Sequence, residues 1–391
     1  MFDQEARLER LLARHRDAVV VEAAPGRRAL VRRDQLLVAG PDAPAARDLV
    51  RRWYDSAHDE HGVTCLRLRS RAKVDVCEMA SLLGGDGGSG GRHRRLNVSP
   101  NHLVCGQPMW WSGPADLPRP AAPVPAPRAG APVRRPVTVA VLDTGLAPHP
   151  WYEDTPWYAE HGAEAAEVLD ADLDYELDSQ AGHGTFIAGV VLRYAPSARL
   201  RAYRVIGGDG VGDELEVIGA LARLAADGGA DVVNLSLGCH TFDDRPSPLM
   251  ARALASLGRG TAVVACAGNA ATDRPFWPAA LKQVISVGAL GPGGDRAWFS
   301  NYGWWVDACA PGVDIASSFV RFDGPRPGPD DPDRFDGFAI WSGTSFAAPA
   351  VAGRIAGLAA SEGVGAVEAA GRLLDPAAHR TLPDLGVLIT S

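Results

Sequence analysis

Three short apolar runs, each followed by a turn, constrain the fold of this chain more than any other feature. They are VTVAVL at 137–142, DVVNLSL at 231–237 and TAVVACA at 261–267, with a shorter run at 284–287. Such runs are typical of strands buried on both faces of a parallel sheet. Helical patterns lie between or after them, at 214–227, 246–258 and 346–360. The alternation predicts an α/β fold with a doubly wound, mostly parallel sheet over residues 137–391.

The chain before this domain divides into a small unit and a linker. Residues 1–107 carry a mixed pattern that predicts an α+β unit, with helices at 4–16, 44–57 and 74–83 and strands at 28–39, 62–68 and 96–105. The glycine run GGDGGSGG at 84–91 is expected to be a flexible loop. Residues 108–136 contain nine prolines and few large apolar side chains, which predicts an extended, semi-rigid linker.

Composition and charge argue against several classes of function. The chain has 391 residues, of which 46% are apolar and 22% charged, as in an ordinary globular protein. Its net charge of −8 argues against general nucleic-acid binding. No apolar run reaches membrane length, no export signal is recognisable, and the six cysteines contain no CxxC pair. We therefore expect a cytoplasmic protein with reduced thiols, without a membrane or nucleic-acid partner, a cofactor or a metal.

Four polar residues stand where the elements of such a sheet begin or end. They are Asp143 at the end of the first strand, His183 in GHGT at a helix start, Asn269 after a later strand, and Ser345 on the first turn of the last long helix. Separately, each has a structural explanation as a turn or capping residue. In an open α/β sheet, however, catalytic and ligand-binding groups gather at the carboxyl ends of the strands. We therefore expect the four side chains to converge.

Together these side chains can perform nucleophilic catalysis. The hydroxyl of Ser345 becomes a good nucleophile when an imidazole, here His183, accepts its proton. The imidazole needs a carboxylate, here Asp143, to fix its tautomer and stabilise its charged form. The oxyanion that follows needs preorganised donors, for which the side-chain amide of Asn269 and the backbone N–H of Ser345 are the candidates.

Five segments, in this order along the chain, resemble the subtilisin-like serine peptidases. They are VAVLDTG, GHGTFIAG, VVNLSLG, VVACAGN and SGTSFAAP, within roughly residues 136–388. The resemblance implies a subtilisin-like fold and a serine endopeptidase that hydrolyses peptide bonds in a peptide or protein substrate. It assigns Asp143, His183 and Ser345 to the catalytic triad and Asn269 to the oxyanion hole.

The resemblance also implies where substrate binds. Ser236, Leu237 and Gly238 form the edge segment that pairs with the peptide backbone upstream of the cut, and Gly210 to Gly212 form the opposing edge. A substrate would then lie extended between two edges. The pocket for the residue before the scissile bond would be lined by Ala267, Gly268 and Phe276. Because Phe276 stands where a small residue would leave this pocket deep, we expect a preference for small or medium side chains.

Two further features near the cleft bear on metal binding and on the choice of substrate, and the second leaves two interpretations open. Ala147 stands where relatives often have an acidic calcium ligand, and the insertion that forms a tight calcium loop in many of them is lacking, so no strong calcium site of that type is expected. An acidic cluster comprises Asp170, Asp172, Asp174, Glu176 and Asp178, with Asp213 and Glu214 after the Gly210 segment. It is either a solvated loop or a surface that attracts arginine or lysine upstream of the cut.

The role of residues 1–107 is also open at this point. Subtilisin-like peptidases often carry an N-terminal propeptide of similar size that blocks the cleft, so this unit is either an inhibitory prodomain or a permanently attached recognition domain. The leading hypothesis for the whole chain is a bacterial processing protease of restricted specificity. The alternative is a catalytically silent module that only binds peptides on the same fold.

Overall fold

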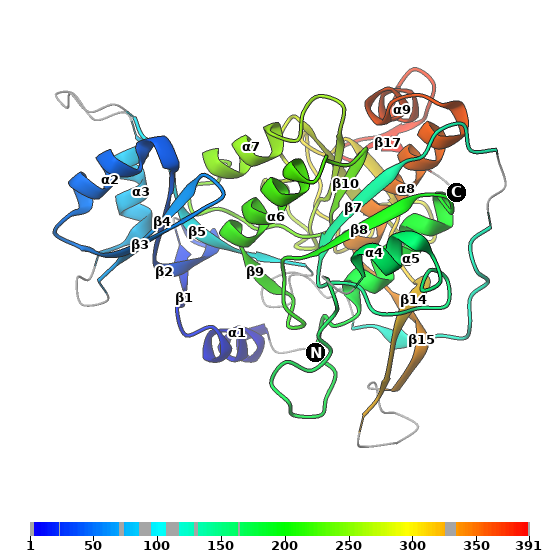
Figure 1. Cartoon of the computed structure of the whole chain (residues 1–391), viewed down its shortest axis with the longest axis horizontal. Coiled ribbons are helices and arrows are strands. Elements are labelled where there is room, and N and C mark those ends of the chain that lie inside the picture. The colour runs from blue at the N-terminus through cyan, green and yellow to red at the C-terminus, as the bar shows by residue number, and fades with distance from the viewer. Residues whose placement is uncertain are drawn as a thin grey trace.

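The chain forms two units that lie side by side and are joined through one strand (Figure 1). The computed structural model describes residues 4–22, 24–69, 74–85, 95–106, 117–128, 132–162, 165–324 and 334–389. Most of the glycine run at 84–91 and part of the linker at 108–136 lie outside the described residues.

The larger unit is built on an eight-stranded sheet with the order β16-β17-β13-β12-β11-β10-β7-β8. Its strands are β7 (Thr138–Asp143), β8 (Arg199–Arg204), β10 (Val232–Leu235), β11 (Ala262–Cys266), β12 (Val284–Leu290), β13 (Ala308–Pro311), β16 (Thr381–Leu382) and β17 (Gly386–Leu388). Neighbours from β17 to β8 are parallel, and β16 pairs antiparallel with β17. The central strands are buried almost throughout, which explains their continuous apolar sequence. The predicted α/β, mostly parallel fold is confirmed.

Two helices begin at predicted site residues: α5 begins at His183, and Ser345 lies in the first turn of α8. Helix α5 (His183–Tyr194) packs against α8 (Thr344–Glu362), which runs along β10 to β13. Helices α6 (Glu214–Ala226) and α7 (Pro248–Ala255) lie on the side nearer the smaller unit (Figure 1). The short helices α4 (Pro156–His161) and α9 (Ala366–Leu373) complete the unit. None of the helices in the described ranges is both long enough and apolar enough to span a bilayer.

The smaller unit is an antiparallel sheet with three helices. Its elements are α1 (Gln4–Arg14), β1 (Ala18–Glu22), β2 (Arg28–Ala39), the 3₁₀ turn η1 (Gly40–Asp42), α2 (Ala43–Val50), β3 (Tyr54–Glu60), β4 (Val63–Leu68), α3 (Val76–Gly84) and β5 (Val98–Cys105). The helix expected over 44–57 is wrong at its end. It stops at Val50, and residues 54–60 instead form β3, because their mostly polar side chains suit a half-exposed edge strand paired with β4.

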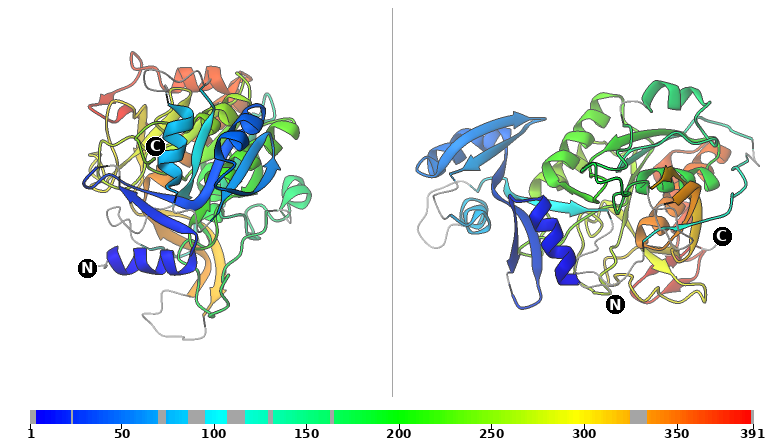
Figure 2. Two further views of the ribbon diagram at one scale, coloured as in Figure 1. Left: turned by 90° about the vertical axis from the view of Figure 1, so that its left-hand side faces the viewer. Right: turned by 90° about the horizontal axis from the view of Figure 1, so that it is seen from below.

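Strand β5 belongs to both units. It pairs with β2 inside the smaller unit and with β9 (Val211–Asp213) of the larger unit, so that one sheet runs β3-β4-β2-β5-β9. The register places Leu103 opposite Asp213, Val104 opposite Gly212 and Cys105 opposite Val211. Figure 2 shows α1 beside this junction, where the two units meet.

The linker is attached to the larger unit rather than standing free. Residues Arg119–Pro120 form β6, which pairs with β15 (Arg334–Trp341) of the hairpin that β15 makes with β14 (Ile315–Asp323). Further along, the backbone N–H of Arg134 donates to the carbonyl of Ala360 at 2.8 Å. The described part of the linker is extended, as expected, but it docks on the larger unit at these two places.

The glycine before His183 gives a test of how tightly this helix start is packed. Gly182 has φ +85°, and an added Cβ would lie 2.3 Å from the buried ring of Phe319, whereas Gly228 has φ +89° and open space around it. Because both positions strain an L-residue but only one also collides, Gly182→Ala should lower the free energy of unfolding by about 2 to 5 kcal/mol and Gly228→Ala by about 1 kcal/mol. Denaturant unfolding of both variants measures this, and equal losses would contradict the packing described.

Candidate active site

The sheet and helix α5 bring an aspartate and a histidine into direct contact. Asp143 is the last residue of β7, and His183 is the first residue of α5. The Nδ1 atom of His183 lies 2.7 Å from Oδ1 of Asp143, and both side chains are buried. A buried carboxylate at Nδ1 holds the ring so that Nε2 is the atom left to exchange a proton with a neighbour.

A second carboxylate, that of the half-buried Glu167, connects the two segments that carry this pair. Glu167 accepts hydrogen bonds from the Thr144 hydroxyl, from the Thr185 hydroxyl at 2.5 Å and from the backbone N–H of Gly182 at 2.6 Å. Thr144 follows Asp143, and Gly182 and Thr185 flank His183. Burial raises the pKa of Glu167, although its three hydrogen bonds oppose that shift. Glu167 therefore fixes the distance between β7 and the start of α5.

Helix α8 places the serine. Its N-cap is Gly343, and Ser345 is the second residue of the first turn. The hydroxyl of Ser345 donates to the carbonyl oxygen of Gly106 at 3.1 Å and lies 3.4 Å from that of Ser236. Nε2 of His183 is buried without a hydrogen-bond partner among the described residues. In this state the Gly106 carbonyl, rather than the imidazole, accepts the hydrogen bond of the Ser345 hydroxyl.

The side-chain amide of Asn269 uses its oxygen in hydrogen bonds, while its nitrogen has no partner among the described residues. Oδ1 of Asn269 accepts from the backbone N–H and from the hydroxyl of Thr344, each at 2.9 Å. These bonds fix the orientation of the amide, and within the described residues Nδ2 is buried without a partner. Since a buried donor without a partner is unfavourable, Nδ2 of Asn269 is a site prepared for an acceptor. Burial raises the pKa of neighbouring Cys266 to about 12, so this thiol stays protonated.

The cleft in front of the serine is filled by the end of β5. The N–H and carbonyl of Cys105 pair with the carbonyl and N–H of Gly238 at 2.9 and 3.0 Å, and the N–H of Gly106 donates to the carbonyl of Gly210 at 3.0 Å. On the other edge, β5 pairs with β9, which contains Gly212. An extended segment thus lies between the two edges at which the sequence predicted a substrate.

The remaining predicted cleft residues either have side chains buried in the core or pack around Phe276. The side chains of Leu237 and Ala267 are fully buried in the core, so only their backbones can face a ligand, and the hydroxyl of Ser236 donates to the carbonyl of Ser345 at 2.8 Å. The ring of Phe276 packs against the backbones of both Gly238 and Gly268, where an added Cβ would lie 2.5 and 3.1 Å from it. Phe276 therefore occupies the space between these two glycines.

The acidic residues do not form one surface. Glu214 is buried with one carboxylate oxygen 3.0 Å from Nδ1 of His102, and Asp213 caps α6 and pairs with Arg32. Both acids thus pair with residues of the smaller unit in the full chain, and their attraction for basic substrates stays a prediction. Among the described residues, the acids whose carboxylates approach one another closely enough for a metal are Asp170, Asp172 and Asp174.

Comparison with known proteins identifies the family. The model of the subtilase family matches residues 134–374, well over half of the chain. The chain belongs to the subtilase family. This subtilase is 35% identical over 253 residues to a thermophilic serine proteinase of Bacillus sp. (strain AK1), covering 56% of this chain and 58% of that protein. It is also 35% identical over 230 residues to subtilisin BL of Lederbergia lenta, covering 56% of this chain and 75% of that protein.

The resemblance inferred from five sequence segments is thereby confirmed. The subtilase spans little more than half the length of the first of these relatives. A solved structure described as a lanthipeptide protease aligns with a TM-score of 0.49 and 21% identity, covering 64% of this chain and 84% of that one.

Four residues at the site were not identified from the sequence. Gly106 directly follows β5, the last strand of the smaller unit, and a glycine after an apolar strand is its only signal in the sequence. Glu167 lies in a loop with no recognisable pattern. Arg14 and Asp209 lie far apart in the sequence and meet only because α1 packs beside β9. Such long-range pairs carry no local signal.

Removing the carboxylate of Glu167 should show whether it positions Asp143 and His183 without contributing to substrate binding. Glu167→Ala leaves three buried donors without an acceptor, so we expect the free energy of unfolding to fall by about 3 to 5 kcal/mol. Because Asp143 and His183 would lose their common support while the cleft edges stay intact, any hydrolytic activity should show a lower kcat with little change in KM. Glu153→Ala, an exposed acid nearby, is the matched control. A variant with normal kcat would show that Glu167 plays no positioning role.

Proposed function

We propose that this subtilase is a serine endopeptidase whose nucleophile is Ser345. The observation that carries the proposal is the position of a peptide carbonyl, that of Gly106, 3.1 Å from the Ser345 hydroxyl beside the His183–Asp143 pair. A peptide bond can therefore reach the nucleophile in an extended conformation. The names of the relatives, which include a serine proteinase and a subtilisin, support the same activity.

In the proposed mechanism, Ser345 attacks the carbonyl carbon of the scissile bond while Nε2 of His183 takes the hydroxyl proton. Asp143 stabilises the imidazolium that forms. The developing oxyanion accepts a hydrogen bond from Nδ2 of Asn269, which is already oriented by Thr344, and from the backbone N–H of Ser345. His183 then protonates the leaving amine, and water hydrolyses the acyl-enzyme by the same steps in reverse.

We further propose that residues 1–107 are an inhibitory prodomain. Strand β5 pairs with both backbone edges of the cleft, and the Gly106 carbonyl accepts the hydrogen bond of the hydroxyl that His183 would have to deprotonate. A substrate cannot bind until this segment leaves. These contacts favour inhibition over the alternative of a recognition domain that leaves the cleft open.

The biological role that fits this arrangement is processing of a particular precursor in the cytoplasm. A filled space at Phe276 supports a narrow choice of the residue before the cut, with small or medium side chains preferred. Five of the six cysteines are buried, and cysteines kept as thiols would suit a reducing compartment. Fractionation of the host cells with an antibody against the chain tests the location.

Self-processing is the first test of the activity. The purified full chain should yield a fragment that begins at residue 107 or 108, and a fluorophosphonate probe should then label Ser345. The Ser345→Ala chain should stay intact and unlabelled. Intact-mass spectrometry of both proteins measures this. A wild-type chain that is neither cut nor labelled, under conditions where it is folded, would favour the silent peptide-binding module.

The open amide of Asn269 gives a second test. Asn269→Ala removes one oxyanion donor and should lower kcat about 100- to 1000-fold, the size of loss measured for such a donor in this family, with KM nearly unchanged. Steady-state hydrolysis of a peptide substrate by the processed enzyme measures both constants. Loss through KM alone would assign the residue to substrate binding instead of the oxyanion hole.

A further inference from the structure

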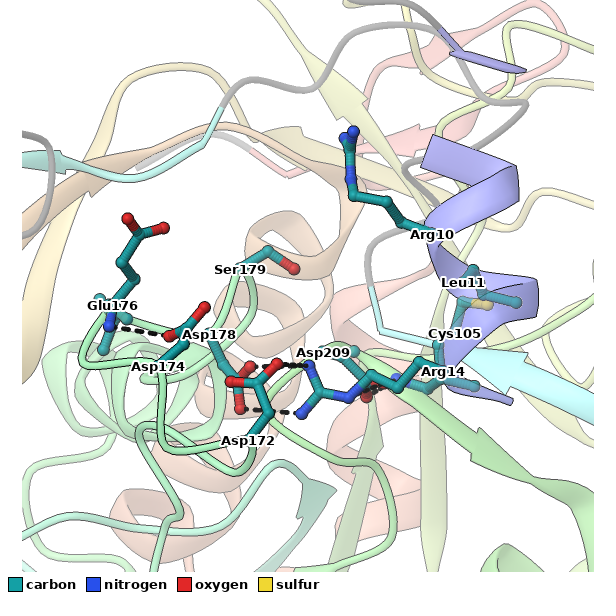
Figure 3. A pocket seen from close by; sticks show the side chains of 13 residues that line it. Arg10, Leu11, Arg14, Cys105, Asp172, Asp174, Glu176, Asp178, Ser179 and Asp209 are labelled. Carbon is teal, nitrogen blue, oxygen red and sulfur yellow. Dashed lines mark hydrogen bonds and ion pairs between the residues drawn. The ribbon is translucent and has the colours of Figure 1, made fainter. Parts of the chain in front are cut away.

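A cavity lies where the cleft, helix α1 and the loop that contains Asp172, Asp174 and Asp178 meet (Figure 3). Its volume is about 320 Å³. The walls come from both units: Arg14 from α1, Cys105 from β5, and Asp172, Asp178 and Asp209 from the larger unit. The cavity therefore borders directly on the segment that fills the cleft.

The cationic group that meets the acids in the wall of this cavity is the guanidinium of Arg14. Arg14 contacts Asp178 through two nitrogens, at 2.9 and 3.4 Å, and lies 3.4 Å from a carboxylate oxygen of Asp172 and of Asp209. The Asp178 side chain is only 6% exposed and that of Asp209 is 17% exposed, so both acids depend on a cationic partner. His15 adds a contact to Asp209 at 2.7 Å. In Figure 3, Arg10 and Glu176 point away from this group.

The same cavity receives a side chain from the cleft. Side chains of a strand alternate between its two faces. Val104 belongs to the core cluster of the larger unit, whereas Leu103 and Cys105 pack with the apolar residues of α1 and with Val211. A residue in the place of Cys105 thus points toward the carboxylates. Asp209 directly precedes Gly210, the residue that accepts the N–H of Gly106.

We propose that Asp172, Asp178 and Asp209 form a subsite for an arginine of the substrate, at the position that Cys105 holds in the full chain. This rests on the proposed peptidase function. In the intact chain, Arg14 fills the subsite as an internal stand-in. When the N-terminal unit leaves, the carboxylates keep their place beside the cleft edge, and a guanidinium from the substrate replaces that of Arg14. Arginine suits the subsite better than lysine, because its planar fork binds one carboxylate through two nitrogens, as Arg14 binds Asp178.

The first experiment tests the subsite inside the full chain, without catalysis. In the Ser345→Ala background, Arg14→Ala should lower the midpoint of thermal unfolding and speed hydrogen exchange in β9. Adding Cys105→Arg should restore at least half of the lost melting temperature and of the lost protection from exchange. The new guanidinium reaches the same carboxylates through the cavity, which Arg14→Ala enlarges. Cys105→Met, of similar length but uncharged, should restore nothing, and neither should Cys105→Arg when Asp178→Asn and Asp209→Asn are also present.

The second experiment measures specificity after processing. Peptides that contain Leu-Val-Xaa-Gly, the sequence of residues 103–106 with Xaa at position 105, are compared with Xaa as arginine, glutamine or methionine. Wild-type enzyme should cleave the arginine peptide with kcat/KM about tenfold or more above the glutamine peptide. In the Asp178→Asn/Asp209→Asn enzyme this ratio should fall toward one, because the arginine peptide loses more of its kcat/KM than the glutamine peptide does. Asp323→Asn, an exposed acid in β14, is the control and should keep the wild-type ratio.

The outcomes separate the two proposals. Rescue by Cys105→Arg together with an arginine preference that needs Asp178 and Asp209 supports the subsite. Equal cleavage of the three peptides by wild-type enzyme, or no rescue in the full chain, overturns the subsite and leaves the peptidase function standing. If no peptide is cut and Ser345 is not labelled, but the rescue occurs, the peptidase function falls while the guanidinium site is supported.

Discussion

The pairing of β5 with both edges of the cleft is the interaction on which the arrangement of the two units depends. On one side β5 forms a ladder with β9, and on the other Cys105 exchanges two backbone hydrogen bonds with Gly238. Buried backbone groups need partners, so both edges favour an extended chain between them. A substrate would use the same groups. The proposed inhibition by the N-terminal unit and the proposed recognition of a substrate would therefore use one set of hydrogen bonds.

Charge and apolar packing have different roles at this junction. Leu103, Cys105 and Val211 pack beneath the apolar face of α1, which supplies most of the stabilisation through burial. The ion pairs of Arg14 and Arg32 with acids of the larger unit then fix the orientation of the docked unit. Exposed ion pairs contribute about 0 to 1 kcal/mol each, but the nearly buried Asp178 makes its pair with Arg14 more sensitive to loss of either partner.

The parts of the structure that follow from local patterns could be predicted from the sequence. Buried parallel strands show as continuous apolar runs, and the turns after them carry Asp143 and Asn269, so the sheet and the convergence of the site were both accessible. The end of α2 was misplaced because the polar residues of β3 have no apolar alternation. Contacts between distant segments, such as Arg14 with Asp178 or Gly106 with Ser345, depend on how the two units dock. No local pattern encodes that docking, so only the structure shows which acid near the cleft pairs with which residue of the smaller unit.

The position of Asp209 connects docking of the smaller unit with the proposed specificity for arginine in the substrate. It is adjacent to Gly210, whose carbonyl binds the backbone of whatever occupies the cleft, and its carboxylate contacts Arg14. If the N-terminal unit departs, Asp172, Asp178 and Asp209 lose the guanidinium of Arg14 and are left as a group of like charges close together, an arrangement that a cation stabilises. Either rebinding of α1 or a substrate arginine relieves it. Under the proposed function, the released unit would compete with substrates that carry arginine at this position, and the proposed prodomain would have to be removed or degraded before such a precursor is processed efficiently.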